Sequence, residues 1–510
     1  MLRHLIPRPD AVRAAALAAD LDAADLRSDP LRAAWGAEAD DALARGMRSP
    51  LLAALGERDD PLAVLGRFFV LGMPQPADAV AAALPRTGID GLEALGLAYR
   101  DGAQVVPAAL VRPQSFVDVD GVGEWWIASD LDETALGTAL PADHVLGVGG
   151  ATRTLAGLVM PAAVDRALDL GTGCGIQALL VARHAGRVVA TDISARALAY
   201  AELNAELAGV HNIDFRQGSM FEPVAGESFD LIVSNPPFVI TPRVEEVTAY
   251  EYRDGGLIGD ALVEEFVRRA PAHLNPGGAA QLLGNWETRD GVPGRDRLES
   301  WIAPELDAWV VERETLSPLR YAELWIRDGG TTPREETFEP LLDAWCDDFA
   351  ARGVTEIGFG YVLLRRPPAP ESGGASERTP APLRRLEHVE QPVSSAGRAF
   401  ATGLRAHDLL AGGMPERLVV ASDVTEARHH MPGQDAPSVI ELHQGGGFGR
   451  TVAVDPALAG FVGACDGELT VAQIVAALAD LFEVPLADLW AELEPRIRAL
   501  MIDGFLLPAS

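Results

Sequence analysis

The stretch Asp169-Leu170-Gly171-Thr172-Gly173-Cys174-Gly175 decides the fold of this 510-residue chain. It follows an apolar run, Ala167-Leu168, and leads into Ile176-Gln177-Ala178-Leu179-Leu180-Val181-Ala182, so we predict a strand, a glycine loop and a helix in that order. Glycines at these positions let the backbone turn tightly and approach a ligand with no Cβ in the way. The stretch therefore predicts the entry to a nucleotide-binding α/β unit.

The glycine spacing and the next strand indicate which class of ligand the loop binds. A dinucleotide site has the spacing G-x-G-x-x-G, and Ile176 stands where its last glycine would be, which argues against a pyrophosphate and a nicotinamide dehydrogenase. A second apolar run, 187–191, ends at Asp192, where a carboxylate can accept from both ribose hydroxyls. The sequence thus indicates a nucleoside ligand, and Ile193, directly after the acid, joins the candidate binding residues.

A second motif, Asn235-Pro236-Pro237-Phe238, ends the apolar run 228–234. The D-x-G-x-G-x-G loop, the acid after the next strand and this N-P-P-F motif together resemble the class I S-adenosylmethionine-dependent methyltransferases. Within that superfamily, N-P-P-[FY] is typical of enzymes that methylate an amino group conjugated to a carbonyl or a ring: glutamine N5, adenine N6 or guanine N2.

Two further runs narrow the resemblance within the superfamily. With Asp254-Gly255-Gly256 and Leu274-Asn275-Pro276-Gly277-Gly278, the segment most resembles the protein-glutamine N5-methyltransferases of translation release factors, and more their eukaryotic and archaeal branch than the bacterial one. The resemblance covers residues from about 145 to 290.

The resemblance implies S-adenosyl-L-methionine as the cofactor and a set of site residues without a metal. The cofactor-binding residues it implies are Asp169, Gly171, Thr172, Gly173, Cys174, Gly175, Asp192, Ile193, Gly218, Ser219, Met220 and Asn235. The catalytic residues it implies are Asn235, Pro236, Pro237 and Phe238.

The chain departs from the family at two places. Ser219 replaces the acid that usually accepts from the adenine amino group, and residues 144–155 lack the P-R-x-E-T pattern of the bacterial release-factor enzymes. Thr152, Arg153 and Thr154 are candidates there by position alone.

The N-P-P-F motif suits a poor nucleophile. An amide or arylamine nitrogen has a delocalised lone pair, and the side-chain oxygen of Asn235 with the carbonyl of Ser234 or Pro236 can accept both N–H bonds of its NH2 group. Pro236 and Pro237 fix φ and remove donors, which leaves a stiff turn, and Phe238 can stack on a planar group. No carboxylate base is required, because the methylated nitrogen sheds its proton easily.

Composition bounds the remaining possibilities. Hydrophobic residues make up 48% and charged residues 23%, as in folded soluble proteins, and the length suggests about three domains. All 42 basic residues are arginine, which we attribute to a GC-rich bacterial genome and which excludes Schiff-base and P-loop chemistry. A net charge of −32 disfavours phosphate backbones as partners.

Cysteine usage and hydropathy indicate the compartment. The three cysteines, Cys174, Cys346 and Cys465, lie far apart, which fits a reducing cytoplasm and argues against structural zinc. No apolar run approaches the roughly 18 residues of a membrane span, and the first ten residues have no secretory h-region. We therefore expect a cytoplasmic protein without a membrane partner.

We predict an α/β fold with three domains and a linker. Residues 141–367 form the methyltransferase domain, a Rossmann-like seven-stranded sheet completed by strands at 321–327 and 355–364 around a helical insert, 333–352. Residues 1–140 form a helical or winged-helix-like domain with a hairpin at 97–106. Residues 368–382 are a linker rich in Pro, Gly and Ser, and 383–510 form a mainly helical accessory domain that also resembles a winged helix.

Three functions remain open at this point. The favoured one is methylation of a glutamine side chain in a protein such as a release factor, with a protein partner favoured over RNA because of the negative charge. The second is methylation of guanine N2 or adenine N6 in ribosomal RNA. The third is a methyltransferase fold that binds without catalysis, suggested by Ser219 and the altered 144–155 region. The oligomeric state is not predicted.

Overall fold

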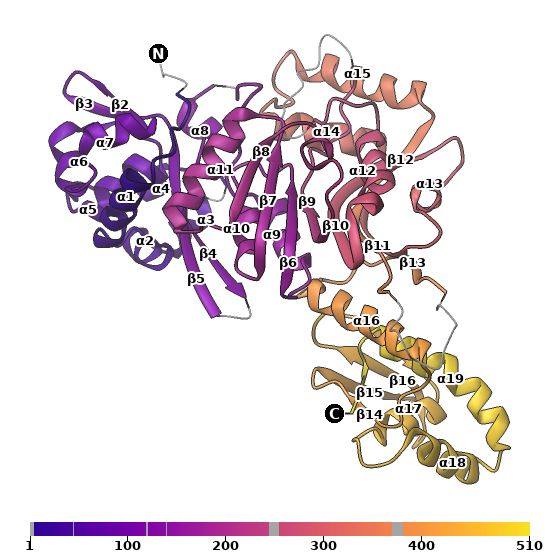
Figure 1. Cartoon of the computed structure of the whole chain (residues 1–510). Coiled ribbons are helices and arrows are strands. Elements are labelled where there is room, and N and C mark those ends of the chain that lie inside the picture. The colour runs from indigo at the N-terminus through magenta and orange to yellow at the C-terminus, as the bar shows by residue number, and fades with distance from the viewer. Residues whose placement is uncertain are drawn as a thin grey trace. The chain divides into compact units, whose positions relative to one another are not determined.

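The computed structural model describes residues 5–43, 45–118, 121–138, 140–243, 254–369 and 381–509. These residues form two compact units (Figure 1). Unit 1 takes in residues within 1–156, 163–367 and 385–387, and unit 2 takes in the remainder. Unit 1 therefore holds both the predicted N-terminal region and the predicted sheet, and each unit is described by itself.

Unit 1 is built on an eight-stranded sheet. In sheet order its strands are β13 (Arg384–His388), β11 (Asp307–Leu316), β12 (Val354–Arg365), β10 (Leu274–Arg289), β9 (Phe229–Ser234), β6 (Val164–Leu170), β7 (Ala185–Asp192) and β8 (Ile213–Gln217). Neighbours from β10 to β8 pair in parallel, whereas β12 pairs antiparallel with both β10 and β11. The order confirms the predicted Rossmann-like sheet, with eight strands instead of seven because β13 extends one edge.

The predicted strand at 321–327 is wrong. Those residues lie in helix α14 (Pro318–Asp328), and the strand beside β12 is β11, which the sequence prediction missed. Ser317 caps the helix by accepting from the Arg320 backbone N–H, and Pro318 occupies its first turn, where proline is favoured. These local signals indicate a helix that begins at Pro318.

The predicted helices of the sheet domain are present. Ser194 caps α11 (Ala195–Ala208), as predicted, and α10 (Ile176–Ala182) follows the glycine loop. Helix α15 (Phe338–Ala351) lies inside the predicted insert. Helices α12 (Ala261–Arg269) and α13 (Gly294–Trp301) pack their apolar residues, including Phe266 and Trp301, into one core with residues of β6, β9, β10, β11 and β12.

The N-terminal region of unit 1 is helical with a small sheet. Its helices are α1 (Ala11–Ala23), α2 (Ser28–Trp35), α3 (Ala37–Leu43), α4 (Ser49–Leu55), α5 (Pro61–Leu65), which continues as the π-helix Gly66–Val70, α6 (Ala77–Ala83) and α7 (Gly88–Leu95). The predicted hairpin is β2 (Ala98–Asp101) with β3 (Gln104–Pro107), and β1 (Gln75–Pro76) adds a third strand. A longer hairpin, β4 (Leu110–Asp118) with β5 (Gly121–Ser129), precedes α8 (Glu133–Leu136) and α9 (Gly150–Leu158).

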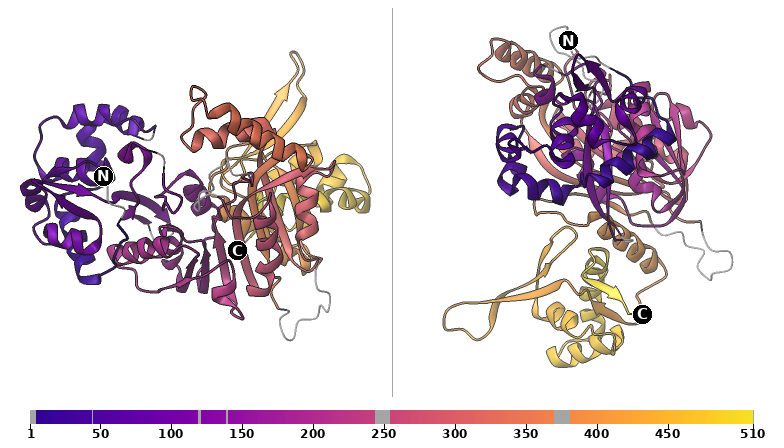
Figure 2. Two further views of the ribbon diagram at one scale, coloured as in Figure 1. Left: turned by 90° about the horizontal axis from the view of Figure 1, so that it is seen from above. Right: turned by 90° about the vertical axis from the view of Figure 1, so that its left-hand side faces the viewer.

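Unit 2 contains more strand than predicted. Its helices are α16 (Ala396–Ala411), α17 (Pro456–Gly463), α18 (Val471–Phe482) and α19 (Leu486–Ile502), and the last two are the predicted amphipathic pair. The sequence prediction missed the sheet of β15 (Val424–His430), β16 (Pro437–Gln444) and β17 (Thr451–Val454), in which β15 and β16 form the long hairpin seen in Figure 2. Strand β18 (Leu506–Pro508) pairs antiparallel with β14 (Leu418–Val420), which lies before α17 in the sequence.

Two further predictions concern the linker and membrane-spanning helices. Most of the predicted linker 368–382, namely residues 370–380, lies outside the described residues. Within the described part of the chain, no helix combines the length and the apolar character that a membrane crossing requires.

Candidate functional site

The two sequence motifs leave neighbouring parallel strands at the same edge of the sheet. Leu170 and Ser234 are paired at the ends of β6 and β9, and the Ser234 Oγ donates to the Leu170 carbonyl oxygen at 2.7 Å. The glycine loop begins at the next residue of one strand and Asn235 at the next residue of the other. The structure therefore brings together the two motifs that the sequence singled out.

The glycine loop has the backbone that its sequence predicts. Gly171, Gly173 and Gly175 have φ of +76°, +54° and +87°, a region that disfavours other residues. A Cβ at Gly171 or Gly173 would meet no described atom within 4 Å, whereas one at Gly175 would lie 2.9 Å from the Ala201 Cα of α11. The first two glycines thus face open space that a ligand can enter, and the third lets α11 pack closely.

Asp169 and Cys174 lie under the loop. Asp169 is only 1% exposed, its Oδ2 accepts from the Thr172 Oγ1 at 2.6 Å, and burial raises its pKa to about 7. Cys174 is buried, burial raises its pKa to about 11, and its carbonyl accepts from the Asn204 Nδ2 at 2.8 Å. Both residues, predicted as cofactor-binding, are placed to hold the shape of the loop.

Asp192 ends β7 beside the loop, as predicted. Its Oδ2 accepts from the Gly173 N–H and its Oδ1 from the Ser194 N–H, each at 2.9 Å, and burial raises its pKa. Each carboxylate oxygen keeps a second lone pair, which is what two ribose hydroxyls require. Ile193 is 64% exposed and presents an apolar surface next to this acid.

The segment 218–220 lies against the same strand end. The Gly218 N–H donates to the Asp192 carbonyl oxygen at 3.0 Å, and a Cβ on Gly218 would lie 2.5 Å from the Pro223 ring, so only glycine fits. Ser219 and Met220 follow and are half-buried, with Met220 at φ +48°. These residues are positioned near Asp192 and Ile193, where an adenine would follow a ribose.

Asn235 carries an unused acceptor. Its Oδ1 is buried and accepts no hydrogen bond from any residue that the structure describes. A buried carbonyl oxygen without a donor costs about 1–3 kcal/mol, so this atom fits a ligand that brings an N–H. Pro236 is buried, and the centroid of the Phe238 ring lies 5.6 Å from the centroid of the Phe359 ring on β12.

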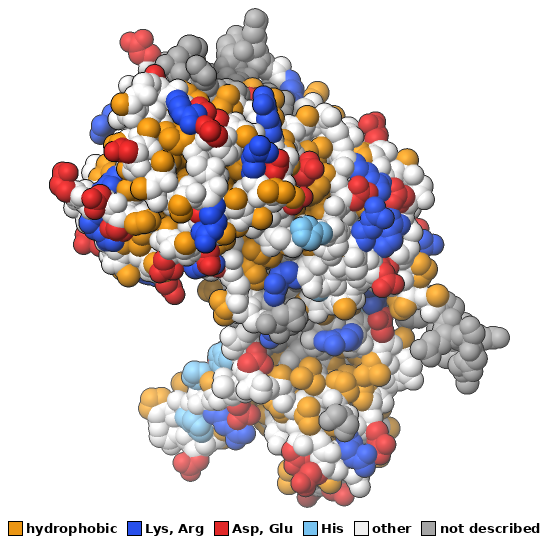
Figure 3. Space-filling view, turned by 60° about the vertical axis from the view of Figure 1, so that its left-hand side comes forward, with side chains coloured by type: hydrophobic (Ala, Val, Ile, Leu, Met, Phe, Trp, Pro, Cys, Tyr) orange, Lys and Arg blue, Asp and Glu red, His pale blue; other side chains and the backbone are white. Residues whose placement is uncertain are grey.

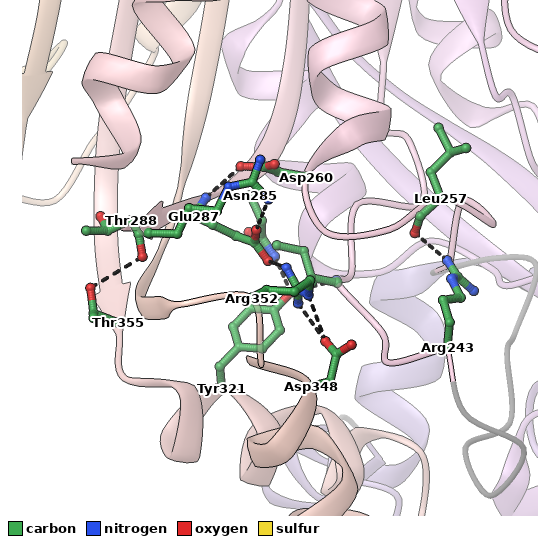
Figure 4. Close-up of polar contacts among 12 residues, drawn as sticks. Arg243, Leu257, Asp260, Asn285, Glu287, Thr288, Tyr321, Asp348, Arg352 and Thr355 are labelled. Atoms are coloured by element: carbon green, nitrogen blue, oxygen red, sulfur yellow. Dashed lines mark hydrogen bonds and ion pairs between the residues drawn. The ribbon is translucent and has the colours of Figure 1, made fainter. Parts of the chain in front are cut away.

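A hollow opens beside the N-P-P-F motif. It is lined by Pro237, Phe238, Val239, Gly255, Leu257, Gly259, Asp260, Leu262 and Val263. Near it, the Arg243 Nη1 donates to the Asp254 Oδ2 at 2.9 Å. The Arg243 Nη2 donates to the Leu257 carbonyl oxygen at 2.6 Å (Figure 4). The Asp254-Gly255-Gly256 run noted in the sequence therefore belongs to this side of the site.

Sequence reasoning missed the charged residues behind this hollow. Asp260 pairs with Arg297 and accepts from the Glu287 backbone N–H at 2.9 Å, while the fully buried Glu287 pairs with Arg352, just after α15 (Figure 4). Burial and the neighbouring Asp260 raise the pKa of Glu287. No motif could have found these residues, because they come from the start of α12, from β10, from α13 and from the end of α15, which lie far apart in the sequence.

The 144–155 region contacts the helix that follows the glycine loop. The Gln177 Nε2 of α10 donates to the Thr152 carbonyl oxygen at 2.6 Å, and the Thr154 Oγ1 donates to the Gly150 carbonyl oxygen within α9. Arg153 is exposed. The structure therefore places α9 beside α10, and the hydrogen bond between them is made by the Thr152 backbone carbonyl.

Comparison with known proteins finds similarity over the part of the chain that contains these residues. Residues 147–290 match the Methyltransferase small domain family, and residues 23–108 match a Domain of unknown function (DUF7059). A release factor glutamine methyltransferase of Xylella fastidiosa is 42% identical over 130 residues, which are 24% of this chain and 47% of that protein. A ribosomal protein uL3 glutamine methyltransferase of Bradyrhizobium diazoefficiens is 40% identical over 133 residues, 23% of this chain and 40% of that protein.

An archaeal relative is similar over the same region. A protein of Methanocaldococcus jannaschii, named provisionally as a protein N5-glutamine methyltransferase, is 35% identical over 119 residues, 23% of this chain and 59% of that protein. The identity is thus no higher for this archaeal protein than for the two bacterial ones. The chain spans about half the length of the curated relatives it matches, and the matched part is the one that contains the glycine loop and the N-P-P-F motif. The similarity to the Methyltransferase small domain family thus extends over residues 147–290, the part of the chain that contains strands β6 to β10 of the Rossmann-like sheet.

Proposed function

We propose that this chain is an S-adenosylmethionine-dependent N-methyltransferase that acts on the side-chain amide of a glutamine in a protein. The single observation that carries the proposal is the buried Asn235 Oδ1, which has no donor among the described residues and stands at the exit of β9 beside the glycine loop. The relatives named above, which share this region, are named for glutamine methylation in proteins.

The residues present fit the cofactor. The open space above Gly171 and Gly173 lets the cofactor lie against the backbone of the loop. Asp192 offers one free lone pair on each carboxylate oxygen to the ribose hydroxyls. The exposed Ile193 and the segment 218–220 supply an apolar and backbone surface for the adenine, in place of the acid that Ser219 replaces. When bound, S-adenosylmethionine supplies a methyl group on a sulfonium.

The residues of the chain prepare the nucleophile. Asn235 Oδ1 accepts one N–H of the target NH2, and the carbonyl oxygen of Ser234 or Pro236 accepts the other, which favours a more pyramidal nitrogen with its lone pair directed to the methyl carbon. Pro236 and Pro237 keep these acceptors in place because their φ angles are fixed. Such positioning in an in-line displacement can lower the barrier by several kcal/mol, on the order of the values for intramolecular reactions.

A protein suits the surface better than RNA. The net charge is −32, and on the face drawn in Figure 3 the arginines lie among aspartates and glutamates and form no continuous basic area over the residues described there. Binding to a phosphate backbone depends on clustered positive charge. We therefore do not propose ribosomal RNA as the substrate, and the test described next would detect its methylation.

The test is methyl transfer by the purified chain. It is incubated with tritiated S-adenosylmethionine and with release factors or ribosomal protein uL3 from cells that lack this protein, and products are sorted by protease and nuclease. We expect protease-sensitive label on glutamine, identified by mass spectrometry, and its loss in Asn235→Ala. Asn275→Ala is the matched control, since Asn275 donates to the Asp230 carboxylate at the amino-terminal end of β9. Unchanged transfer by Asn235→Ala would overturn the mechanism, and label that only nuclease removes would overturn the substrate.

A further inference from the structure

The helical insert α14–α15 touches the segment that leaves the N-P-P-F motif. The insert lies between β11 and β12, outside residues 147–290 that match the methyltransferase family. Val239 and Ile240, which follow Phe238, are 5% and 1% exposed and belong to one hydrophobic cluster with Tyr321 of α14 and Trp345 of α15. The first residues after the motif are therefore part of the core of the insert.

A tyrosine hydroxyl joins the two. The Tyr321 Oη accepts from the Ile240 backbone N–H at 3.0 Å and from the Asn285 Nδ2 of β10 at 2.5 Å; Figure 4 shows Tyr321 below Asn285. Tyr321 is 2% exposed, and burial raises its pKa, so the hydroxyl stays protonated. A buried backbone N–H needs an acceptor, and at Ile240 this side chain is the one that the structure provides.

We propose that Tyr321 is a positioning residue for the proposed methyl transfer, because it fixes the downstream end of the Asn235-Pro236-Pro237-Phe238 turn. The upstream end is fixed by the bond from the Ser234 Oγ to the Leu170 carbonyl. Between these two anchors the prolines leave few degrees of freedom, so the direction of the Asn235 side chain depends on both. The inference rests on the proposed function for its catalytic meaning.

The second helix of the insert braces the same region. Arg352, just after α15, donates to the buried Glu287 and to Asp348, and a Cβ on Gly259 would lie 2.9 Å from the Arg352 Nη1. Gly259 lines the hollow beside Phe238. Helix α14 thus supports the turn and α15 supports the opposite wall, so the insert supports the site from two sides.

The experiment compares Tyr321→Phe with Trp345→Phe in the full chain. Tyr321→Phe removes only the hydroxyl. Trp345→Phe removes packing from the same cluster, since the ring centroids of Trp345 and Tyr321 lie 6.2 Å apart, and among the described residues Trp345 makes no hydrogen bond to the turn. Hydrogen exchange measured by mass spectrometry follows the Ile240 amide, and steady-state kinetics give kcat and the KM for the cofactor.

For Tyr321→Phe we expect about tenfold faster exchange at Ile240 with no change in the glycine-loop peptide, and about tenfold lower kcat with an unchanged KM for the cofactor. For Trp345→Phe we expect a lower Tm but wild-type exchange at Ile240 and kcat within twofold of wild type. The proposal is overturned if Ile240 exchanges at the wild-type rate in Tyr321→Phe, or if both variants lose kcat equally. If the wild-type chain transfers no methyl group, the proposed function fails, while the exchange measurement still decides whether Tyr321 fixes the turn.

Discussion

The Ser234 Oγ donates a hydrogen bond to the Leu170 carbonyl oxygen across 2.7 Å, and this bond joins the carboxyl ends of β9 and β6. Both residues are buried. The next residue of each strand begins a functional segment, so the relative position of the glycine loop and Asn235 depends on a single hydroxyl as well as on the strand pairing.

Ser234→Ala tests this relationship. The loss of one buried hydrogen bond is expected to lower the free energy of unfolding by about 1 kcal/mol and to lower kcat for methyl transfer severalfold. The matched control is Ser228→Ala, which removes the bond from the Ser228 Oγ to the Asn275 Oδ1 at the other end of β9. The control should cost similar stability in urea unfolding and leave kcat unchanged. Equal losses of kcat in both variants would show that strand stability, and not the joined strand ends, governs activity.

Asp192→Asn tests the ribose contact. The variant keeps an acceptor oxygen but places an NH2 group where the other oxygen now accepts a backbone N–H, and it loses the negative charge. We expect calorimetry to show at least about tenfold weaker binding of S-adenosylhomocysteine, which corresponds to about 1.4 kcal/mol. Asp214→Asn on the neighbouring strand breaks an ion pair with Arg216 and should bind normally. Wild-type affinity in Asp192→Asn would remove this carboxylate from the cofactor site.

Asp169→Asn is expected to change how stability depends on pH. Burial raises the pKa of Asp169 to about 7 in the folded chain, above the ordinary value of 3.8. Between these values the unfolded chain ionises while the folded chain keeps the proton, so wild-type stability falls as pH rises, by up to about 4 kcal/mol. The asparagine variant lacks this loss and should gain stability relative to wild type between pH 4 and pH 7 in urea unfolding.

Thr172→Val provides the companion measurement. It removes the hydroxyl that donates to the Asp169 Oδ2 and so raises the folded pKa further. The decline of stability should then continue above pH 7, where the wild-type decline has ended. Curves for wild type and Asp169→Asn that run parallel from pH 4 to pH 8 would contradict the raised pKa.

The sequence could predict those parts of the site whose residues lie close together along the chain. The glycine loop, Asp192 and the N-P-P-F turn are short motifs in which spacing carries the chemistry, and the structure brings their strand ends together. Tyr321 could not be predicted, because its role depends on a contact between α14 and Ile240, which lie far apart in the sequence. The cap at Ser317 and Pro318 was the available signal for that helix.

The buried ion pair of Asp130 and Arg196 links the N-terminal region to the sheet domain. The Arg196 Nε donates to the Asp130 Oδ2 at 2.9 Å, and the Tyr200 Oη and the Val145 N–H also donate to this carboxylate. Burial alone would raise the pKa of Asp130, but the hydrogen bonds and charge of Arg196 outweigh it and lower the pKa. Because Asp130 follows β5 and Arg196 lies on α11, the pair ties two regions that are far apart in the sequence.

Arg196→Met leaves Asp130, which is 4% exposed, without its cation, and is expected to cost about 3–5 kcal/mol of unfolding free energy. Adding Asp130→Asn should restore part of that loss, because the double variant buries no charge. Arg268→Met, which breaks the surface pair with Glu264, should cost no more than about 1 kcal/mol.

Helix α11 also carries Asn204, which donates to the carbonyl oxygens of Ala128 and Cys174. Because Cys174 belongs to the glycine loop, Arg196→Met should weaken cofactor binding as well as stability. Urea unfolding measures the stability, and calorimetry measures the binding of the cofactor. A loss of unfolding free energy well below about 3 kcal/mol in Arg196→Met, or a double variant less stable than Arg196→Met, would mean that the pair does not hold the N-terminal region against the glycine loop.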